Sequence, residues 1–584
     1  MRKALGYSLV IMLFALALIA GAGCDGGGLD IKMATPDSGD QPDDGGGGDD
    51  GGGDDDDGDN GGGGGGGGGG DTGDTRFAGN WLASFTDDRT TASAQYGPIQ
   101  YAILLNIRQR GTGISGSGTL FRVFREGPTA SNRIAVQMSG STSGDDATFT
   151  LRSGSGGLDR DQTWYVRLGD DRMAGMYLAA DSAGTLSRSG HALWHKTSSN
   201  SRADTPWAAA YTDDFGIAGY PQRSRTVSVT PVLDQANLLG SGTMYEQAGL
   251  PPELNFDIVR GGLSGSEIGF TFGGLDLIEN EVDWFGFFGG DIMATAYGQF
   301  DVSDALIRFG HTIWVRAPEQ ALTAITGAWA GSFRDRTVES PNDPGDFTAV
   351  FHLTANDGGV VTGYVLMRNE ADDAPEFERY NIDSGSIIGT QVQLSMSRLT
   401  GSFFWDLRLC EDRLVGSYQR FVGSQNRFVA TGHAEFRTMT SAGILRGTWA
   451  SAYVDTYGAV QPEQSQLALV TVSSQASAGA PFSGYGALRF AGESRRRLFN
   501  VAGEVVSGDI VWEWRGADLF GRTVWHLRRC NDLLYGAYTN YTSGGAIEVG
   551  AAQRLVGQND QPRREQLLAL GEIGHHLAAP ADIA

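Results

Sequence analysis

Four copies of one short stretch decide the fold, and they read Ala78-Gly-Asn-Trp-Leu-Ala-Ser-Phe85, Thr205-Pro-Trp-Ala-Ala-Ala-Tyr211, Thr326-Gly-Ala-Trp-Ala-Gly-Ser-Phe333 and Arg446-Gly-Thr-Trp-Ala-Ser-Ala-Tyr453. Their tryptophans, Trp81, Trp207, Trp329 and Trp449, are 126, 122 and 120 residues apart. A repeat of that length is a whole domain, because propeller blades take only roughly 40–50 residues. The 584-residue chain is therefore predicted to contain four related domains in a row.

The first repeat is divided by Gly, Ser, Asn and Asp into eight short runs. In the second run Ile99, Tyr101 and Ile103 alternate with the intervening positions, which is typical of a strand with one buried face. No amphipathic helix of length is visible between 76 and 557. Sequential strands joined by short turns favour a meander, and eight strands are enough to close a barrel. We therefore predict an all-β fold of four tandem antiparallel up-and-down eight-stranded β-barrels, the first built from the runs 81–85, 98–108, 116–124, 133–138, 147–152, 163–168, 173–179 and 191–196.

The domain boundaries follow from the repeat and from the ends of the chain. We expect a signal peptide at 1–23 and a disordered linker at 24–76. A tail at 558–584 follows the repeats, with a short helix expected within 561–576. The four predicted barrel repeats are 77–199, 204–318, 323–439 and 443–557.

Three of the repeats open on a motif known from a barrel family. Gly79-Asn-Trp81, Gly327-Ala-Trp329 and Gly447-Thr-Trp449 resemble the Gly-x-Trp that opens calycin barrels, the group of lipocalins and avidins. Repeat two departs from it with Thr205-Pro-Trp207. The resemblance implies that each opening tryptophan plugs the closed end of its barrel, which is a packing role. The biotin-contacting residues of avidins cannot be aligned with this chain, so no ligand-binding residue is transferred.

The first residues indicate the compartment. Arg2 and Lys3 precede an apolar run at 9–20, which is shorter than the ~20 residues of a membrane-spanning helix. Gly21-Ala-Gly-Cys24 then resembles the lipobox of bacterial lipoproteins, although Gly21 departs from the leucine favoured there. The resemblance implies cleavage before Cys24, diacylation of its sulfur and acylation of its amino group. Several acyl chains together anchor a protein stably in a membrane. Ordinary secretion is the alternative.

The signal peptide indicates the cell envelope and leaves two membranes to choose from. We expect the outer membrane of a Gram-negative bacterium, on its periplasmic or surface face. Asp25 resembles an inner-membrane retention signal of some bacteria, so the choice of membrane stays open.

Charge and composition exclude some partners. Residues 25–76 hold 15 Asp and 23 Gly and almost no apolar side chain, so this linker is predicted to be disordered. It lacks the ordered Asp/Gly spacing of a calcium loop, so we expect no specific calcium site. The chain carries a net charge of −25 and no basic cluster, which argues against nucleic acid as a partner.

Several residue types recur at the repeat spacing, and we interpret them as structural. Histidines recur in Gly190-His191, Gly310-His311 and Gly432-His433, and each has no second ligand at metal spacing. Zinc needs three or four ligands, so no metal site is predicted. We expect these histidines near the opening tryptophans, because the last strand of a barrel pairs with the first. Cys410 and Cys530 are predicted to be buried thiols, with an interdomain disulfide as the alternative.

Other acidic, histidine and tyrosine positions also have structural interpretations. The acidic pairs Asp87-Asp88, Asp213-Asp214 and Asp372-Asp373 are predicted to lie in solvated turns, and His575-His576 in a solvated tail. The pattern does not decide whether the four recurring tyrosines point into or out of their barrels; they are Tyr177, Tyr297, Tyr418 and Tyr538.

No catalytic or cofactor-binding motif is present, so we expect a protein that is not an enzyme and has no cofactor. The preferred hypothesis is a membrane-anchored cell-envelope lipoprotein whose repeated barrels bind a small ligand or an envelope protein. The first alternative is a structural or adhesive surface spacer without a ligand. The second is a hydrolase with an unrecognised site. The contents of the barrel interiors would separate binding from spacing, because small eight-stranded barrels either are filled by side chains or hold one small ligand.

Overall fold

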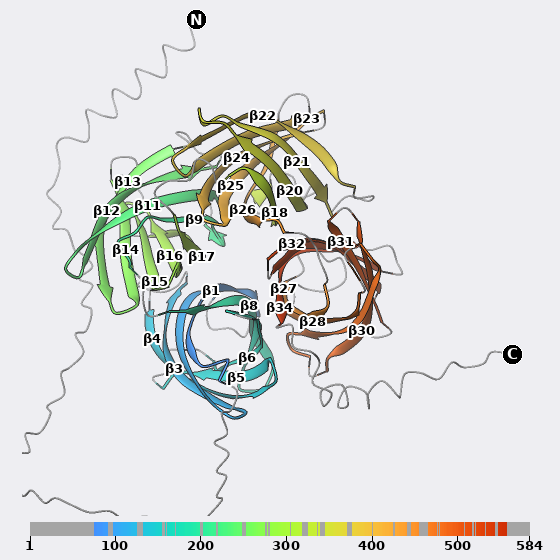
Figure 1. Ribbon diagram of the computed structural model, residues 1–584. Helices are drawn as coiled ribbons and strands as arrows, with labels where there is room; N and C mark the ends of the chain where they lie inside the picture. Colours follow the sequence, from blue (N-terminus) through green and yellow to red (C-terminus); the bar gives the residue numbers. More distant parts are fainter. Residues whose placement is uncertain are drawn as a thin grey trace, which may run out of the picture. The chain divides into compact units, whose positions relative to one another are not determined.

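The computed structural model describes residues 75–557 apart from short internal segments, the longest of which are 92–96, 125–131, 248–252, 318–324, 339–344, 371–375, 441–444, 455–464 and 543–546. Cys24, the linker up to 74, Asp372-Asp373 and the tail from 558 lie outside the described residues. Within the described residues the chain is all-β, as predicted, without an α-helix (Figure 1). None of the described elements is a helix long and apolar enough to cross a membrane.

Repeats one and four each form a closed barrel, in which every strand pairs antiparallel with the next and the last pairs with the first. Barrel 1 consists of β1 (Gly79–Thr90), β2 (Gln100–Arg110), β3 (Gly113–Val123), β4 (Asn132–Ser143), β5 (Asp146–Arg152), β6 (Gln162–Leu168), β7 (Arg172–Ala180) and β8 (Leu186–Thr197). Barrel 4 consists of β27 (Gly447–Val454), β28 (Ser465–Ser474), β29 (Phe482–Phe490), β30 (Arg497–Val506), β31 (Asp509–Arg515), β32 (Gly521–Cys530), β33 (Leu533–Thr542) and β34 (Ile547–Gly557). In Figure 1 they are blue to cyan and orange to red.

Repeats two and three keep the eight-strand order, but their first strand is in two pieces. β9 and β10 both pair with β17, and β18 and β19 both pair with β26. Barrel 2 consists of β9 (Trp207–Thr212), β10 (Phe215–Gly216), β11 (Ser224–Asp234), β12 (Asn237–Glu246), β13 (Glu253–Ser264), β14 (Glu267–Gly273), β15 (Val282–Gly289), β16 (Ile292–Phe300) and β17 (Leu306–Arg316). Barrel 3 consists of β18 (Gly327–Arg334), β19 (Thr337–Val338), β20 (Asp346–Ala355), β21 (Val361–Asn369), β22 (Glu378–Ile388), β23 (Gln391–Arg398), β24 (Gly401–Cys410), β25 (Arg413–Val422) and β26 (Arg427–Thr438).

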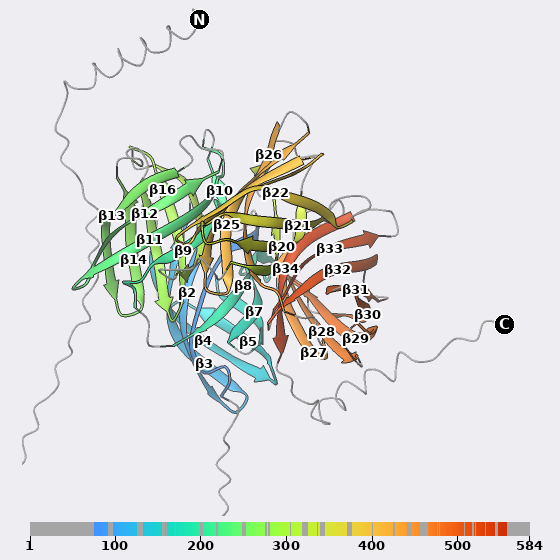
Figure 2. The same cartoon turned by 45° about the horizontal axis from the view of Figure 1, so that its top comes forward.

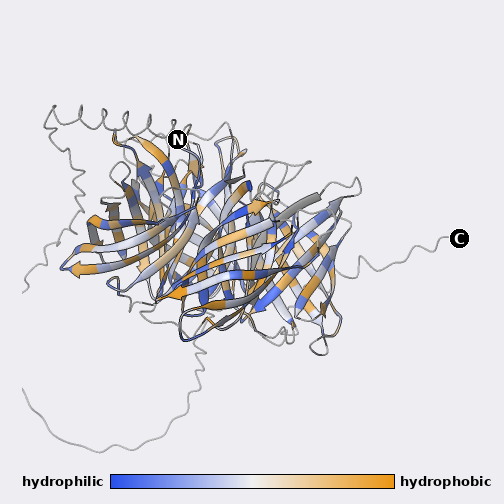
Figure 3. Cartoon of the chain, turned by 90° about the horizontal axis from the view of Figure 1, so that it is seen from above, coloured by the Kyte–Doolittle hydropathy of each residue, from blue (hydrophilic) through white to orange (hydrophobic). Residues whose placement is uncertain are grey.

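The barrel interiors are packed with the chain's own side chains. Hydrophilic and hydrophobic positions alternate along the strands (Figure 3), as expected where one face of each strand lines a barrel. All 12 tryptophans are buried. The indole Nε1–H of each opening tryptophan donates to the carbonyl four residues earlier, at 2.8 Å in Trp81, 3.1 Å in Trp207, 2.8 Å in Trp329 and 3.0 Å in Trp449. This recurring bond holds the chain entering each barrel against the indole, a packing role as the calycin resemblance implied.

The four barrels also contact one another and belong to one compact unit. The outer face of the first two strands of barrels 1, 2 and 3 packs against the last three strands of the next barrel, and β27 and β28 of barrel 4 pack against β7 and β8 of barrel 1 in the same way. Small side chains of the first strands allow this approach: Ala208, Ala330 and Ala450 point outward from their barrels and are still buried. Figure 2 shows the same strands from a second direction.

We call each contact between two barrels a seam. At two seams, a threonine at the equivalent strand position forms hydrogen bonds with the neighbouring barrel. Thr226 of barrel 2 donates to the Asp406 carbonyl (2.8 Å) and accepts from the Ser417 N–H (2.8 Å). Thr348 of barrel 3 donates to the His526 carbonyl (3.3 Å) and accepts from the Ala537 N–H (3.0 Å). A polar pair recurs as well, from Ser224 Oγ to Thr431 Oγ1 (2.9 Å) and from Ser465 Oγ to Ser189 Oγ (3.1 Å). The seams are therefore related to one another, as the barrels are.

Candidate functional site

A buried aspartate recurs near the far end of the first strand. Asp87, Asp213 and Asp335 each follow the opening tryptophan by six residues. At ~3.3 Å per strand residue this is roughly 20 Å, so the aspartate lies near the barrel end opposite the tryptophan. In barrels 2 and 3 the first strand is interrupted here, and in barrel 1 the pairing of β1 with β8 shifts between Asp87 and Arg89. An irregularity of this kind re-aims a side chain, and here the carboxylate turns inward.

The prediction that Asp87-Asp88 and Asp213-Asp214 lie in solvated turns is wrong. Asp87 is 6% exposed and Asp213 is 1% exposed. A carboxylate can be buried where it is hydrogen-bonded and paired with a cation, and both partners come from strands later in the repeat.

The first partner is the recurring tyrosine, which points into its barrel. The Tyr297 hydroxyl donates to Asp213 Oδ1 (2.7 Å), the Tyr418 hydroxyl to Asp335 Oδ1 (2.8 Å), and Tyr177 donates to Asp87 in the same way. Burial, and next the facing aspartate, raises the pKa of all three tyrosines well above its ordinary value. The hydroxyls therefore stay protonated and act as donors.

Each tyrosine is held by a tryptophan directly across its hairpin. Trp284 pairs with Tyr297 across β15 and β16, with ring centroids 4.5 Å apart. The equivalent pairs are Trp164 with Tyr177 (4.9 Å), Trp405 with Tyr418 (4.6 Å) and Trp525 with Tyr538 (4.4 Å).

The second partner is an arginine. Arg188 Nη1 lies 2.5 Å from Asp87 Oδ2, Arg308 Nε lies 3.5 Å from Asp213 Oδ2, and Arg420 Nη2 lies 2.7 Å from Asp335 Oδ2. Arg188 and Arg308 come from the last strand, whereas Arg420 comes from β25, directly opposite Ala430 on the last strand. Barrel 3 thus keeps the ion pair with an arginine from the neighbouring strand.

The recurring histidines bind next to this cluster. His191 Nδ1 lies 2.7 Å from Asp88 Oδ2, and His311 Nδ1 lies 2.6 Å from Asp214 Oδ2. In repeat three Arg336 replaces that aspartate, and His433 contacts Thr212 of barrel 2 instead, at 2.9 Å. First and last strands pair as expected, but His191 and His311 contact the second aspartate rather than the opening tryptophan. Among the described residues no three His, Cys, Asp or Glu side chains are grouped to hold a metal.

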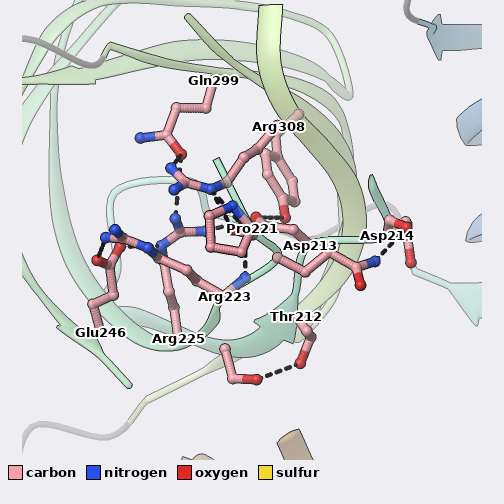
Figure 4. Close-up of polar contacts among 12 residues, drawn as sticks. Thr212, Asp213, Asp214, Pro221, Arg223, Arg225, Glu246, Gln299 and Arg308 are labelled. Carbon is pink, nitrogen blue, oxygen red and sulfur yellow. Dashed lines mark hydrogen bonds and ion pairs between the residues drawn. The ribbon is translucent and has the colours of Figure 1, made fainter. Parts of the chain in front are cut away.

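Barrel 2 extends the cluster with further charges (Figure 4). Arg225 on β11 donates from Nη1 to Asp213 Oδ1 (2.6 Å), from Nε to Glu246 Oε2 (2.9 Å) and from Nη2 to Gln299 Oε1 (3.2 Å). The Gln299 oxygen also accepts from Arg308 Nη1 at 3.1 Å. Arg225 therefore sits at the centre of a network that joins three other strands.

Arg223 completes this network at its edge. Its Nη1 donates to Glu246 Oε1, and its backbone N–H donates to Asp213 Oδ2 at 2.8 Å. The Arg223 side chain is 36% exposed, whereas those of Arg225 and Arg308 are 2% and 4% exposed. We call Asp213, Arg223, Arg225, Glu246 and Arg308 the barrel 2 cluster.

The barrel 2 cluster carries more positive than negative charge, because three guanidinium groups face two carboxylates. Burial, and next Arg308 and Arg225, lowers the pKa of Arg223 to about 10. Burial and Arg225 likewise lower the pKa of Arg308. Burial acts against Arg225 as well, but Asp213 outweighs it and raises the pKa of Arg225 above its ordinary value. The positive charge that the two carboxylates leave uncompensated therefore lies at Arg223 and Arg308.

Barrels 1, 3 and 4 have no arginine at the position of Arg225. The residue equivalent to Arg225 faces the aromatic ring of the first strand, and it is Tyr101 in barrel 1, Phe347 in barrel 3 and Gln466 in barrel 4. Those side chains fill the space without adding charge. The sequence contained the signal, since Trp-x5-Asp occurs in all four repeats and Arg223 and Arg225 occur only in the second.

The two cysteines are free, buried thiols, so the disulfide alternative is wrong. Cys410 packs among apolar residues at the seam of barrels 2 and 3, and Cys530 at the seam of barrels 3 and 4. Burial raises the pKa of each thiol to about 12. These thiols are packing groups rather than nucleophiles.

No protein-family model and no curated protein matches this sequence. Among solved structures, a DUF3598-family protein of unknown function from Nostoc punctiforme matches at 11% identity and a TM-score of 0.17, covering 40% of this chain and 96% of its own. A transferrin-binding protein B variant from Haemophilus parasuis matches at 10% identity and a TM-score of 0.17, covering 66% and 83%. Intact Ap-TbpB matches at 10% identity and a TM-score of 0.15, covering 67% and 86%. At these values the likenesses indicate nothing about the function of this chain.

Proposed function

We propose that this chain is a cell-envelope lipoprotein, anchored through Cys24, whose second barrel binds a small ligand. The other three barrels serve as a scaffold for the second. The observation that carries the proposal is the barrel 2 cluster. Asp87, Asp213 and Asp335 each have a tyrosine and an arginine as partners. Barrel 2 adds Arg223, Arg225 and Glu246. A departure of this kind within an otherwise repeated arrangement supports a specialised role for that copy.

The packed interiors support a site at the mouth of barrel 2 rather than deep inside it. Phe270, Phe272, Trp284 and Trp314 are buried together within that barrel. Trp284 and Trp314 meet edge to face with centroids 5.0 Å apart, a packing that fills the lumen. The partly exposed Arg223 is the group of the cluster that a ligand from solvent would meet first.

In this proposal the chain is not an enzyme. Each described tyrosine hydroxyl of the clusters donates to a carboxylate that an arginine also holds. Groups paired in this way orient and neutralise one another. A hydrolase would instead need a nucleophile within hydrogen-bond reach of an oriented base.

A spacer without a ligand is the second candidate, and the related seams favour it. Barrels stacked through apolar and hydroxyl contacts would form one rigid body beyond the anchor. In that case the barrel 2 cluster would be an ion-pair network that only stabilises the barrel.

Native mass spectrometry of the full chain, purified from the envelope, separates the two candidates. We expect a mass that includes both the acyl chains and a retained small molecule. Arg225→Tyr, which copies barrel 1, should lose the small molecule and keep the acyl chains, whereas Cys24→Ala should lose the acyl chains. Arg152→Gln, at an exposed arginine of barrel 1, is the control. Acylated protein without any additional mass in all variants would support the spacer.

A further inference from the structure

The geometry points to a small oxyanion, a carboxylate or a phosphate, as the ligand of the barrel 2 cluster. This inference rests on the proposed function and names the chemistry of its ligand. Three observations carry it: the donors that remain on two arginines, the charge balance, and the exposure of one edge of the cluster.

The first observation concerns the guanidinium donors. An arginine has five N–H groups, on Nε, Nη1 and Nη2. Toward the described residues Arg223 donates through Nη1 alone, to Glu246. Arg308 donates through Nε to the Pro221 carbonyl (2.8 Å) and through Nη1 to Gln299. Nε and Nη2 of Arg223 and Nη2 of Arg308 donate to none of the described residues, so they remain as donors for a ligand.

The second observation is the charge balance. Arg223, Arg225 and Arg308 together carry one positive charge more than Asp213 and Glu246 compensate. Arg223 is partly exposed and shares Glu246 with Arg225, so one further carboxylate beside Arg223 would bring the sum to zero. The fork of a guanidinium matches the paired oxygens of a carboxylate or phosphate, so the same groups that supply charge also supply geometry.

The third observation is access. Arg223 is 36% exposed and stands directly before β11, whereas Asp213 is fully enclosed. Figure 4 shows the side chains of Arg223, Arg225 and Arg308 close together inside the ring of strands. A ligand can therefore approach the cationic edge, while the carboxylates of the cluster remain covered. A cation would meet the guanidinium groups first and be repelled, and a neutral molecule would leave the excess charge in place.

The test is a titration of the full chain in low-chloride Tris at pH 7, followed by calorimetry and by the thermal unfolding midpoint. The probes are inorganic phosphate, acetate and succinate, with acetamide as the neutral match to acetate. We expect saturable one-to-one binding of at least one anion, a higher unfolding midpoint with that anion, and no binding of acetamide. Comparison of phosphate with acetate and succinate shows whether the site prefers a phosphate or a carboxylate.

Variants locate the site. Arg223→Gln should weaken anion binding by about tenfold or more, because the hydrogen bond from the guanidinium to the charged ligand is lost. The replaced side chain is partly exposed. Arg223→Lys keeps the charge without the fork and should give an intermediate affinity. Arg152→Gln should bind as the wild type does. Because Arg223→Gln could disturb Glu246, the unfolding midpoint without anion is recorded for each variant.

The outcomes also distinguish this inference from the proposed function. Absence of saturable anion binding, or equal binding by Arg223→Gln and the wild type, overturns the inference. A neutral molecule retained in native mass spectrometry and lost in Arg225→Tyr would overturn the oxyanion and leave the proposed function standing. No retained molecule together with no anion binding would overturn both.

Discussion

At the scale of single residues, the bond from tyrosine to aspartate recurs in barrels 1, 2 and 3. Tyr297 and Tyr418 are fully buried, and each hydroxyl has a fully enclosed carboxylate as its acceptor. Leaving a buried acceptor short of one donor costs more than the bond itself contributes in water, because solvent cannot replace the donor.

We predict that Tyr297→Phe and Tyr418→Phe each lower the free energy of unfolding by about 1–3 kcal/mol. The remaining arginine partner should keep each aspartate charged and the barrel folded. Urea unfolding, followed by tryptophan fluorescence, measures the loss. Tyr364→Phe is the control, because this tyrosine stacks on His352 with centroids 4.6 Å apart at a half-exposed position. A loss in the control as large as in the two variants would contradict the prediction.

The sequence pattern identifies these tyrosines without orienting them, and it predicts the wrong environment for Asp87 and Asp213. A pair such as Asp87-Asp88 has the composition of a solvated turn. Its burial depends on Tyr177 and Arg188, which are 90 and 101 residues away. The pattern around Asp87 is local, whereas the partners that permit its burial are not, so local patterning predicted the wrong environment.

At the scale of strands, the glycine before each recurring histidine is the constrained residue. Gly190, Gly310 and Gly432 pair directly with Tyr177, Tyr297 and Tyr418 on the preceding strand. A Cβ on Gly310 would lie 2.7 Å from the Tyr297 hydroxyl oxygen, and one on Gly190 would lie 2.5 Å from the Tyr177 ring. The tyrosine lies across the glycine, so the strand needs a residue without a side chain there.

Gly310→Ala should therefore destabilise barrel 2 by about 1–3 kcal/mol, because the added methyl group displaces Tyr297 from Asp213. Gly269→Ala in the same barrel is the matched control, since its Cβ would meet nothing closer than 3.7 Å. We expect the control to be neutral or slightly stabilising, because alanine restricts the unfolded chain. Urea midpoints of both variants give the comparison, and equal midpoints would argue against the tyrosine contact as the cause.

Strand number and order were predictable where strand ends were not. The eight runs of repeat one correspond to β1–β8, because alternation and turn residues are local signals. The first run was expected to end at 85, but β1 continues to Thr90. The division of β9 from β10 after Thr212 follows from the inward turn of Asp213, which depends on arginines from other strands.

At the scale of the whole molecule, the contacts between barrels at the seams are not predictable from the repeat alone. Outward alanines such as Ala208 and Ala330 look like ordinary surface positions in the sequence, and they become seam residues because a neighbouring barrel covers them. The fourth barrel returns to the first, with Ser465 donating to Asp88 at 2.7 Å across 377 residues. Periodicity predicts four domains, whereas contacts between them depend on surfaces that are complementary only in three dimensions.

Glu435 connects three of the barrels. Its Oε1 accepts from Arg437 Nε in barrel 3 (2.8 Å) and from the Tyr535 hydroxyl in barrel 4 (3.2 Å). Burial acts to raise the pKa of Glu435, but Arg437, Arg413 and Arg172 of barrel 1 outweigh it and hold the pKa at about 2, below the ordinary 4.5. The unfolded chain therefore binds this proton more readily than the folded chain does.

Stability from Glu435 should be fully present above pH 4.5 and be lost as the pH falls toward 2, by about 3 kcal/mol at most. Glu435→Gln removes this dependence, so the variant should be less stable than the wild type at pH 7 and approach it near pH 2.5. Urea unfolding at pH 7, 5, 4, 3 and 2.5 measures the difference, with exposed Glu253→Gln as the control. A constant difference between variant and wild type over this range would show that Glu435 contributes by packing rather than by charge, and that the barrels meet there without an electrostatic link.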